Sequence, residues 1–259
     1  MIGKDSLVGQ WVWFVLLGVV FLWAFSGPME DFPRIIVGLP NAVDYMSRMF
    51  PPDLSILPEL FGPMAETVQV AIVAIVLSTV IALPLSILGA RNMASRAWVY
   101  FSARGTMNLL RMIPTLIWAA LFVAVVGLGP LAGIFALTCH CIGTLGKFFS
   151  EGIEAITSDV VEALDAMRVD GASEMQVVFY GLFPALSSLF IGYILYYFEY
   201  NIRVGTVLGL VGAGGIGLRL NMAIRLFKRQ ETFTILLLIL FVVMLVDRSS
   251  RLIRERFLV

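Results

Sequence analysis

Residues Thr157 to Pro184 read TSDVVEALDAMRVDGASEMQVVFYGLFP, and they form the longest polar interlude in a strongly apolar chain. The capping-box pattern, in which a capping residue is followed three positions later by Glu or Gln, occurs here twice, at Asp159–Glu162 and at Ser173–Gln176. Gly171 lies between the two patterns, and glycine commonly ends a helix. The stretch therefore predicts two short helices that are separated at Gly171.

The first of these helices is predicted to be amphipathic. Acidic residues occupy one part of its surface, and apolar residues recur at helical spacing on another face, namely Val160, Val161, Leu164 and Met167. A capped amphipathic helix between two apolar segments is suited to docking in the groove of a partner. The alternative is a well-capped loop that binds no partner, and the helix pattern alone leaves both interpretations open.

The composition of the whole chain indicates a membrane protein. Of its 259 residues, 59% are hydrophobic and only 14% are charged, and the mean hydropathy is +0.93. The long uncharged runs that result are typical of membrane spans. A formal net charge of zero argues against nucleic acid as the main partner, and one His and two Cys leave little material for a metal site or a disulfide framework.

We expect an all-α membrane protein with about six transmembrane helices. The predicted spans are Trp11–Phe25, Met64–Ala90, Met112–Gly129, Leu131–Gly146, Leu182–Phe198 and Thr232–Val246. The first could instead be a signal peptide, but no small-x-small cleavage site follows it. We accordingly divide the chain into residues 1–63, a first span with an extracytoplasmic loop, and residues 64–259, the main transmembrane domain.

The distribution of arginines predicts the orientation. A cluster without acidic residues follows the second span and marks the cytoplasmic side, namely Arg91, Arg96, Arg104 and Arg111. The proline-rich segment Gly27–Pro63 is poor in Lys and Arg, so we expect an extracytoplasmic loop there. Counting spans from these points places Thr157–Pro184 and both termini in the cytoplasm.

One glycine-rich segment with its flanking cations departs from the rule that Lys and Arg lie on the cytoplasmic side. Val204–Gly217 contains six glycines in fourteen residues, too short and too flexible for a spanning helix, so we expect non-helical backbone that is buried or lines a cavity. Cations surround it on the predicted outer side: Arg203, Arg219, Arg225, Lys228 and Arg229. This segment could line a path for an anion, dock an acidic face of a soluble partner, or be a tolerated basic loop; the topology itself could also be wrong.

Several local signals were weighed as candidate sites. An ionisable His140 inside a predicted span is costly and suggests function, although it could simply fill the helix. Cys139 and Cys141 flank it, but adjacent helical positions point about 100° apart and cannot converge on one metal. Glu199 and Arg203 are four residues apart and could form a structural pair or meet a charged substrate. The G-x-G-x-x-G run at Gly212–Gly217 lacks the βαβ context of a dinucleotide site.

The sequence also lacks the motifs of an enzyme. There is no G-x-x-x-x-G-K-[ST] phosphate loop, no HExxH and no nucleophile–base set. Any ATPase that acts together with this chain must therefore be a separate chain. We expect no catalytic residue, no metal and no cofactor in this chain, and the absence of a ladder of intramembrane carboxylates disfavours a proton-coupled carrier.

The opening stretch resembles the loop shared by permease subunits of ABC importers. That family pattern is Glu-Ala-Ala, three residues, Gly, and a Leu-Pro thirteen residues beyond the Gly, and it corresponds here to Asp165-Ala166-Met167, Gly171 and Phe183-Pro184. Asp165 replaces the usual glutamate and Phe183 replaces the usual leucine. We expect these two departures to affect the fine geometry of the contact with the ATPase subunit. In the family this loop is the coupling helix that seats in a cleft of the ATPase subunit.

The middle of the chain is similar to permeases of phosphonate importers in particular. The matching runs include Arg111–Pro114, Gly127–Pro130, Gly146-Lys147, Asn201–Arg203 and Thr206–Val211. The resemblance implies type I importer architecture, with two copies of this chain, two ATPase subunits and one extracytoplasmic substrate-binding protein in the cell membrane. It implies phosphonates or related phosphorus oxyanions as substrates. The alternatives are an importer permease for another solute such as methionine, whose permeases contain a related glycine-rich run, and a secondary carrier or channel.

The residue patterns and the resemblance together give the candidate site residues. ATPase coupling is expected from Glu162, Asp165, Ala166, Arg168, Asp170, Gly171, Ala172 and Ser173. The translocation path or gate is expected to include His140, Glu199, Asn201, Arg203, Thr206, Gly212, Gly214 and Gly215.

Overall fold

The structure is a computed structural model that describes residues 4–94, 96–156 and 158–257. Within these residues every regular element is a helix. The chain divides into two compact units, Met1–Pro51 and Pro52–Val259, and each is described by itself below.

The first unit is one long helix, α1 (Lys4–Ser47). The predicted span Trp11–Phe25 lies inside it, whereas the loop expected from residue 27 onward is wrong because the helix continues to Ser47. The segments Trp11–Gly27 and Phe32–Ser47 meet at 47°. A proline removes one backbone donor and bends a helix, but it does not always end it, so a proline-rich composition was a poor guide here.

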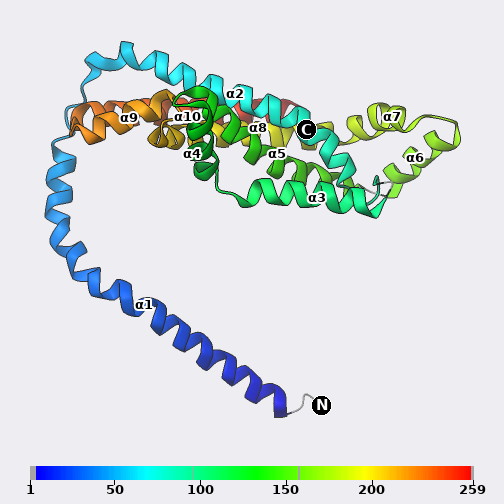
Figure 1. Cartoon of the computed structure of the whole chain (residues 1–259), viewed down its shortest axis with the longest axis horizontal. Coiled ribbons are helices and arrows are strands. Elements are labelled where there is room, and N and C mark those ends of the chain that lie inside the picture. The colour runs from blue at the N-terminus through cyan, green and yellow to red at the C-terminus, as the bar shows by residue number, and fades with distance from the viewer. Residues whose placement is uncertain (1–3, 95, 157, 258–259) are drawn as a thin grey trace. The chain divides into compact units, whose positions relative to one another are not determined.

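The second unit is a helical bundle whose long elements run side by side (Figure 1). Its elements are η1 (Leu54–Ile56), α2 (Leu57–Leu88), α3 (Ala97–Met112), α4 (Thr115–Val126), α5 (Pro130–Glu154), α6 (Ser158–Val169), α7 (Glu174–Gln176), the π-helical η2 (Val177–Leu182), α8 (Phe183–Leu208), η3 (Gly209–Val211), α9 (Gly215–Arg225) and α10 (Arg229–Phe257). In the described residues four helical segments are long and apolar enough to cross a membrane, and up to six if each of two bent pairs counts as one span.

The bent pair of the second unit is α3 with α4, which meet at 87°. Sequence analysis expected a loop up to Arg111 and a span at Met112–Gly129, but α3 is helical, and α4 has only 12 residues. Twelve helical residues extend about 18 Å, well short of a hydrocarbon core of roughly 30 Å. Pro114 explains the bend, because the residue before a proline is disfavoured in helical geometry and Ile113 is extended here.

Helix α5 lies at the centre of the bundle and packs on α2, α3, α4 and α8. Its side chains Leu137, Leu145 and Phe149 are fully buried. Gly143 allows the close approach of α3, because a Cβ atom at this position would lie 2.6 Å from the backbone oxygen of Met107. Small residues at such crossings let helix backbones approach closely in membranes.

The two segments that sequence analysis singled out lie at opposite ends of this bundle. In Figure 1, α6 and α7 extend from one end, and α9 with its preceding glycine-rich turn lies at the other. The expected non-helical run Val204–Gly217 is wrong in its first part, because α8 and η3 continue to Val211. The helical path breaks only at Gly212–Gly214, where Gly212 and Gly214 have φ values of 93° and 76°.

Candidate functional site

The hinge between α6 and α7 is built on Gly171. Its φ of 88° lies in the left-handed region, which glycine adopts without the steric cost that a Cβ atom brings. The Ala172 N–H donates to the Met167 carbonyl at 3.0 Å, and the Asp170 N–H donates to the Ala166 carbonyl at 3.0 Å. The six-to-one bond with glycine in this position is the Schellman motif, so the predicted helix stop is confirmed.

The start of α7 is a reciprocal capping box. The Ser173 N–H donates to Gln176 Oε1 at 2.8 Å, and the Gln176 N–H donates to Ser173 Oγ at 3.4 Å. This confirms the second predicted pattern. Thr157 and the side chains of Asp159, Asp165 and Arg168, which the sequence analysis also named, lie outside the described residues.

From this cap the chain continues as one helical path into the bundle. Helix α7 passes through the π-helical turn Val177–Leu182 into α8 without a loop. Val177 and Leu182 are buried in the same core cluster as Phe149 of α5. A π turn inside a longer helix is often found at functional sites. A displacement of α7 would therefore pass directly along the backbone into a membrane span.

The α6–α7 hairpin has an inner and an outer surface. Val160, Met167 and Ala172 pack against the core cluster. On the outer side Val169 is 86% exposed and Tyr180 is 76% exposed, and Met175 and Phe179 are exposed as well. Next to them a hollow of about 400 Å³ is lined by Met167, Asp170, Gly171, Ala172, Gln176 and Tyr180. Exposed apolar groups that gather beside a hollow are typical of a protein–protein contact.

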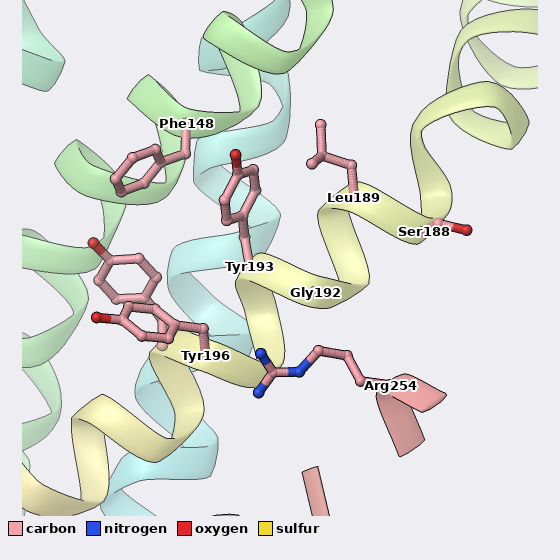
Figure 2. A pocket seen from close by; sticks show the side chains of 8 residues that line it. Phe148, Ser188, Leu189, Gly192, Tyr193, Tyr196 and Arg254 are labelled. Atoms are coloured by element: carbon pink, nitrogen blue, oxygen red, sulfur yellow. The ribbon is translucent and has the colours of Figure 1, made fainter. Parts of the chain in front are cut away.

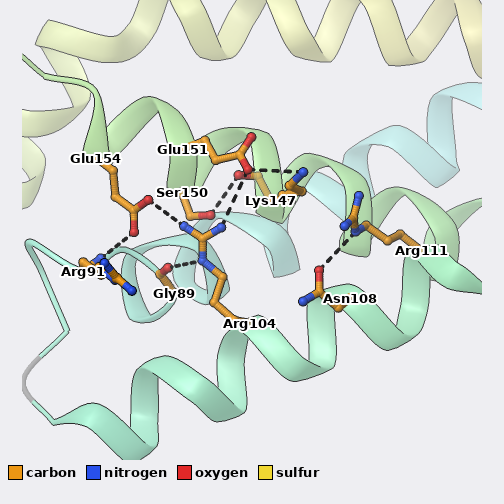
Figure 3. Close-up of polar contacts among 9 residues, drawn as sticks. All are labelled: Gly89, Arg91, Arg104, Asn108, Arg111, Lys147, Ser150, Glu151 and Glu154. Atoms are coloured by element: carbon orange, nitrogen blue, oxygen red, sulfur yellow. Dashed lines mark hydrogen bonds and ion pairs between the residues drawn. The ribbon is translucent and has the colours of Figure 1, made fainter. Parts of the chain in front are cut away.

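A network of charged residues fixes the end of the bundle from which α6 departs (Figure 3). The Arg104 guanidinium of α3 contacts Glu154 Oε2 of α5 at 2.8 Å and Glu151 Oε1 at 3.9 Å. Arg104 Nε also donates to the Gly89 carbonyl at 2.7 Å, and the Arg91 N–H donates to Glu154 Oε1 at 2.8 Å. These contacts join the end of α2, the side of α3 and the last turns of α5 directly before the hairpin.

Some of the predicted path residues meet between α5 and α8. The His140 ring stacks on Tyr200 with centroids 6.1 Å apart, and Cys141 Sγ donates to Asn201 Oδ1 at 3.2 Å. Asn201 is fully buried, and its Nδ2 has no hydrogen-bond partner among the described residues; the same holds for His140 Nδ1. Buried donors and acceptors are usually paired, so these atoms mark a polar spot inside the bundle that is suited to a water or a ligand.

Glu199, which precedes Tyr200 directly on α8, forms an ion-pair cluster. Its side chain is 7% exposed, and it contacts Arg254 Nη2 of α10 at 3.2 Å and Arg203 Nη2 at 3.9 Å. The predicted pair with Arg203 is thus present, but the shorter contact is with Arg254. Thr206 donates its hydroxyl to the Arg203 carbonyl of the same helix at 2.6 Å, a local bond to the preceding turn.

Gly212, Gly214 and Gly215 do not join this cluster. They line a separate hollow of about 500 Å³ at the opposite end of the bundle from α6, together with Glu66 and Arg219. Glu66 Oε1 accepts the Gly215 N–H at 3.0 Å, and Thr67 Oγ1 accepts the Ile216 N–H at 2.9 Å. A carboxylate at this position stabilises the N-terminus of α9 through its free N–H groups and its dipole.

The sequence analysis did not assign the partners that complete these clusters. Arg254 lies 55 residues from Glu199, and Glu66 lies 149 residues from Gly215. The local sequence holds no signal for such long-range pairs, apart from the general rule that a charge within a span needs a partner.

Comparisons with known proteins agree with this architecture. The family described as "Binding-protein-dependent transport system inner membrane component" matches residues 82–258. The phosphite transport system permease protein PtxC of Stutzerimonas stutzeri is 37% identical over 243 residues, 94% of this chain and 87% of the relative. The phosphate-import permease protein PhnE of Mycolicibacterium smegmatis is 35% identical over 216 residues, 83% of this chain and 40% of the relative.

Solved structures show the same fold. The inward-facing MetNI methionine ABC transporter matches with a TM-score of 0.68 and 22% identity, covering 79% of this chain and 99% of that one. The expected all-α membrane fold and the resemblance to ABC importer permeases are confirmed. The chain belongs to the family of binding-protein-dependent transport system inner membrane components.

Proposed function

We propose that this chain is the permease subunit of an ATP-driven importer that carries phosphite, phosphonates or related phosphorus oxyanions across the inner membrane. The observation that carries this proposal is the 37% identity to a phosphite transport permease, which extends over 94% of the chain. Methionine is supported less well as the substrate. The methionine transporter is only 22% identical to this chain, so the similarity concerns the fold alone.

The ATPase of this importer is a separate subunit that docks on the α6–α7 hairpin. The chain contains no phosphate-binding loop of its own. The hairpin offers exposed apolar side chains, exposed acids at Glu162 and Asp170, and a hollow of about 400 Å³. The coupling role extends to Asp165, Ala166, Arg168, Gly171, Ala172 and Ser173. Closure of the ATPase pair would displace the hairpin, and the continuous path through η2 would move α8.

The hairpin faces the cytoplasm in this proposal, and both termini lie on that side. Support comes from Arg91, Arg104 and Lys147, which lie at the end of the bundle from which the hairpin departs (Figure 3), because Lys and Arg are enriched on the cytoplasmic side of membrane proteins. The glycine-rich turn and α9 then face the extracytoplasmic binding protein. Two copies of this chain would assemble with two ATPase subunits and one binding protein.

The translocation path in this assembly runs past the polar residues of α5 and α8. His140, Asn201, Glu199 and Arg203 would contribute polar and charged groups within the spans. Thr206, Gly212, Gly214 and Gly215 would form its extracytoplasmic gate, where the break in the helix leaves a hollow. Arg203 would supply the cation that an anionic cargo meets on this path.

Reconstitution tests this function directly. The chain would be assembled with its ATPase and binding-protein subunits in proteoliposomes, and uptake of phosphite, a methylphosphonate, phosphate and methionine would be compared. We expect ATP-dependent uptake of a phosphorus oxyanion and stimulation of ATP hydrolysis by the loaded binding protein. Uptake of methionine alone would favour the other importer, and uptake by the isolated chain without ATP would identify a secondary carrier.

A further inference from the structure

A cavity of about 540 Å³ opens on α8 toward α5 and α10, and it borders the Glu199 ion-pair cluster through Arg254 (Figure 2). It is lined by Phe148, Ser188, Leu189, Gly192, Tyr193, Tyr196, Tyr197 and Arg254. Ser188 and Gly192 are small residues one helical turn apart on α8, and they leave room beside the helix. The volume is ample for a small tetrahedral anion with an organic substituent.

The walls of this cavity are mainly carbon. Phe148 and Tyr193 stack with ring centroids 5.1 Å apart, and Phe148 also lies 6.1 Å from the Tyr197 ring. Leu189 adds an aliphatic side chain on the same helix. Such walls favour a ligand with an apolar part and offer little to a fully hydrated ion.

Arg254 gives the cavity its charge. In Figure 2 its side chain reaches from α10 toward α8. One nitrogen, Nη2, contacts Glu199 at 3.2 Å, whereas Nε is buried and has no acceptor among the described residues. A guanidinium offers five donors in a planar fork that matches the oxygens of phosphorus oxyanions, so this pairing leaves donors to spare.

The charges around Arg254 do not balance. Glu199 is one carboxylate between two guanidinium groups, Arg254 at 3.2 Å and Arg203 at 3.9 Å. The cluster therefore carries a formal charge of about +1, and its two guanidinium groups remain accessible, with side chains that are 53% exposed for Arg203 and 36% exposed for Arg254. Bound anionic oxygens would supply the missing negative charge.

We propose that this cavity binds a phosphorus oxyanion that carries a small apolar substituent, with Arg254 as its cationic anchor. The inference rests on the proposed function, since it places a substrate-binding site within the permease itself. The P–H or P–C side of the ligand would lie against Phe148, Leu189 and the tyrosine rings, and its oxygens would meet the guanidinium. The phosphate of a membrane lipid shares this chemistry and is the second source of such an anion.

The test uses the purified permease–ATPase complex in nanodiscs, without binding protein, and measures equilibrium binding of radiolabelled phosphite. Removing Arg254 alone would leave the buried Glu199 with only the 3.9 Å contact to Arg203, so the test variant is the double substitution Glu199→Gln/Arg254→Gln. We expect it to weaken phosphite binding by about 10- to 100-fold, as the loss of charge-assisted hydrogen bonds implies. Glu199→Gln alone keeps the cation and should bind at least as tightly as wild type.

Arg251→Gln is the matched control, because Arg251 lies on the same helix but is exposed and paired with Asp247 at 3.0 Å. Nanodiscs of phosphatidylcholine and of phosphatidylglycerol separate the two sources of anion. If wild type binds phosphite in both kinds of nanodisc, the ligand is the substrate. If native mass spectrometry shows that wild type retains one phosphatidylglycerol and the double variant does not, the ligand is the lipid.

If wild type and the double variant bind phosphite equally and also retain phosphatidylglycerol equally, the cavity is not an anion site and the inference is overturned. If wild type still takes up phosphorus oxyanions in that case, the proposed function survives and only the site is wrong. Failure of wild type to take up any of them would instead reject the proposed function.

Discussion

The hinge at Gly171 offers a sharp test of how force reaches the membrane helices. Gly171 has a φ of 88°, and a Cβ atom added there would meet no neighbouring atom within 4 Å, so the main cost of a Gly171→Val substitution is expected to come from the backbone conformation. A left-handed conformation costs a residue with a Cβ atom about 1–2 kcal/mol, and a β-branched residue is especially ill-suited to it. The native hinge would then be populated about 5- to 30-fold less relative to competing conformations.

Gly171→Val should therefore uncouple the importer without preventing its insertion. The complex would be reconstituted, and substrate taken up per ATP hydrolysed would be measured beside the amount of chain in the membrane. Transport per ATP should fall several-fold while insertion stays at the wild-type level. Gly171→Asn is the matched control, since Asn tolerates left-handed geometry and should preserve most coupling. Normal transport per ATP in the valine variant would refute the hinge argument.

Three further substitutions test other parts of the account. Asp170→Lys reverses an exposed charge beside the hairpin hollow, so it should reduce copurification of the ATPase subunit several-fold; an unchanged pull-down would count against docking there. Arg104→Ala removes the 2.8 Å contact with Glu154 and should lower the free energy of unfolding by about 2 kcal/mol, seen as a lower melting temperature in detergent. Gly143→Ala places a methyl group against the Met107 backbone and should cost about 1–3 kcal/mol by the same measurement; equal stability would show that α3 can move away from α5 at little cost.

Each of these variants has a control in the same chain. Glu59→Lys reverses an exposed acid near the α9 end of the bundle and should leave the ATPase pull-down unchanged. Arg96→Ala removes an exposed arginine just before α3 and should leave the melting temperature unchanged. Gly105→Ala adds a methyl group where no atom lies within 4 Å and should not destabilise the chain.

The local sequence predicted the features that depend on neighbouring residues. The stop at Gly171 and the cap at Ser173–Gln176 follow from backbone geometry and spacing over a few positions, and both are present. The break at Gly212–Gly214 was expected within a longer run. Its boundaries could not be found from glycine content, because Gly205 and Gly209 are accommodated inside helical segments by packing.

Features that depend on distant residues were not predictable in this way. Glu199 was expected to pair with Arg203 on its own helix, but α10 brings Arg254 closer. The bend before Pro114 turned an expected loop and span into two helices at 87°. Whether a proline ends a helix, as expected after residue 27, or bends it depends on packing that no local pattern records.

The central claim is that the α6–α7 hairpin contacts the ATPase subunit, and cross-linking tests it most directly. A Val169→Cys substitution places a thiol at a position that is 86% exposed, in a chain whose Cys139 and Cys141 have been replaced by serine. In assembled membranes we predict cross-linking of this thiol to the ATPase subunit, and none from Leu226→Cys near the opposite end of the bundle. Labelling of the Val169→Cys thiol by an impermeant reagent from the extracytoplasmic side, or cross-linking to the ATPase from Leu226→Cys alone, would contradict the account.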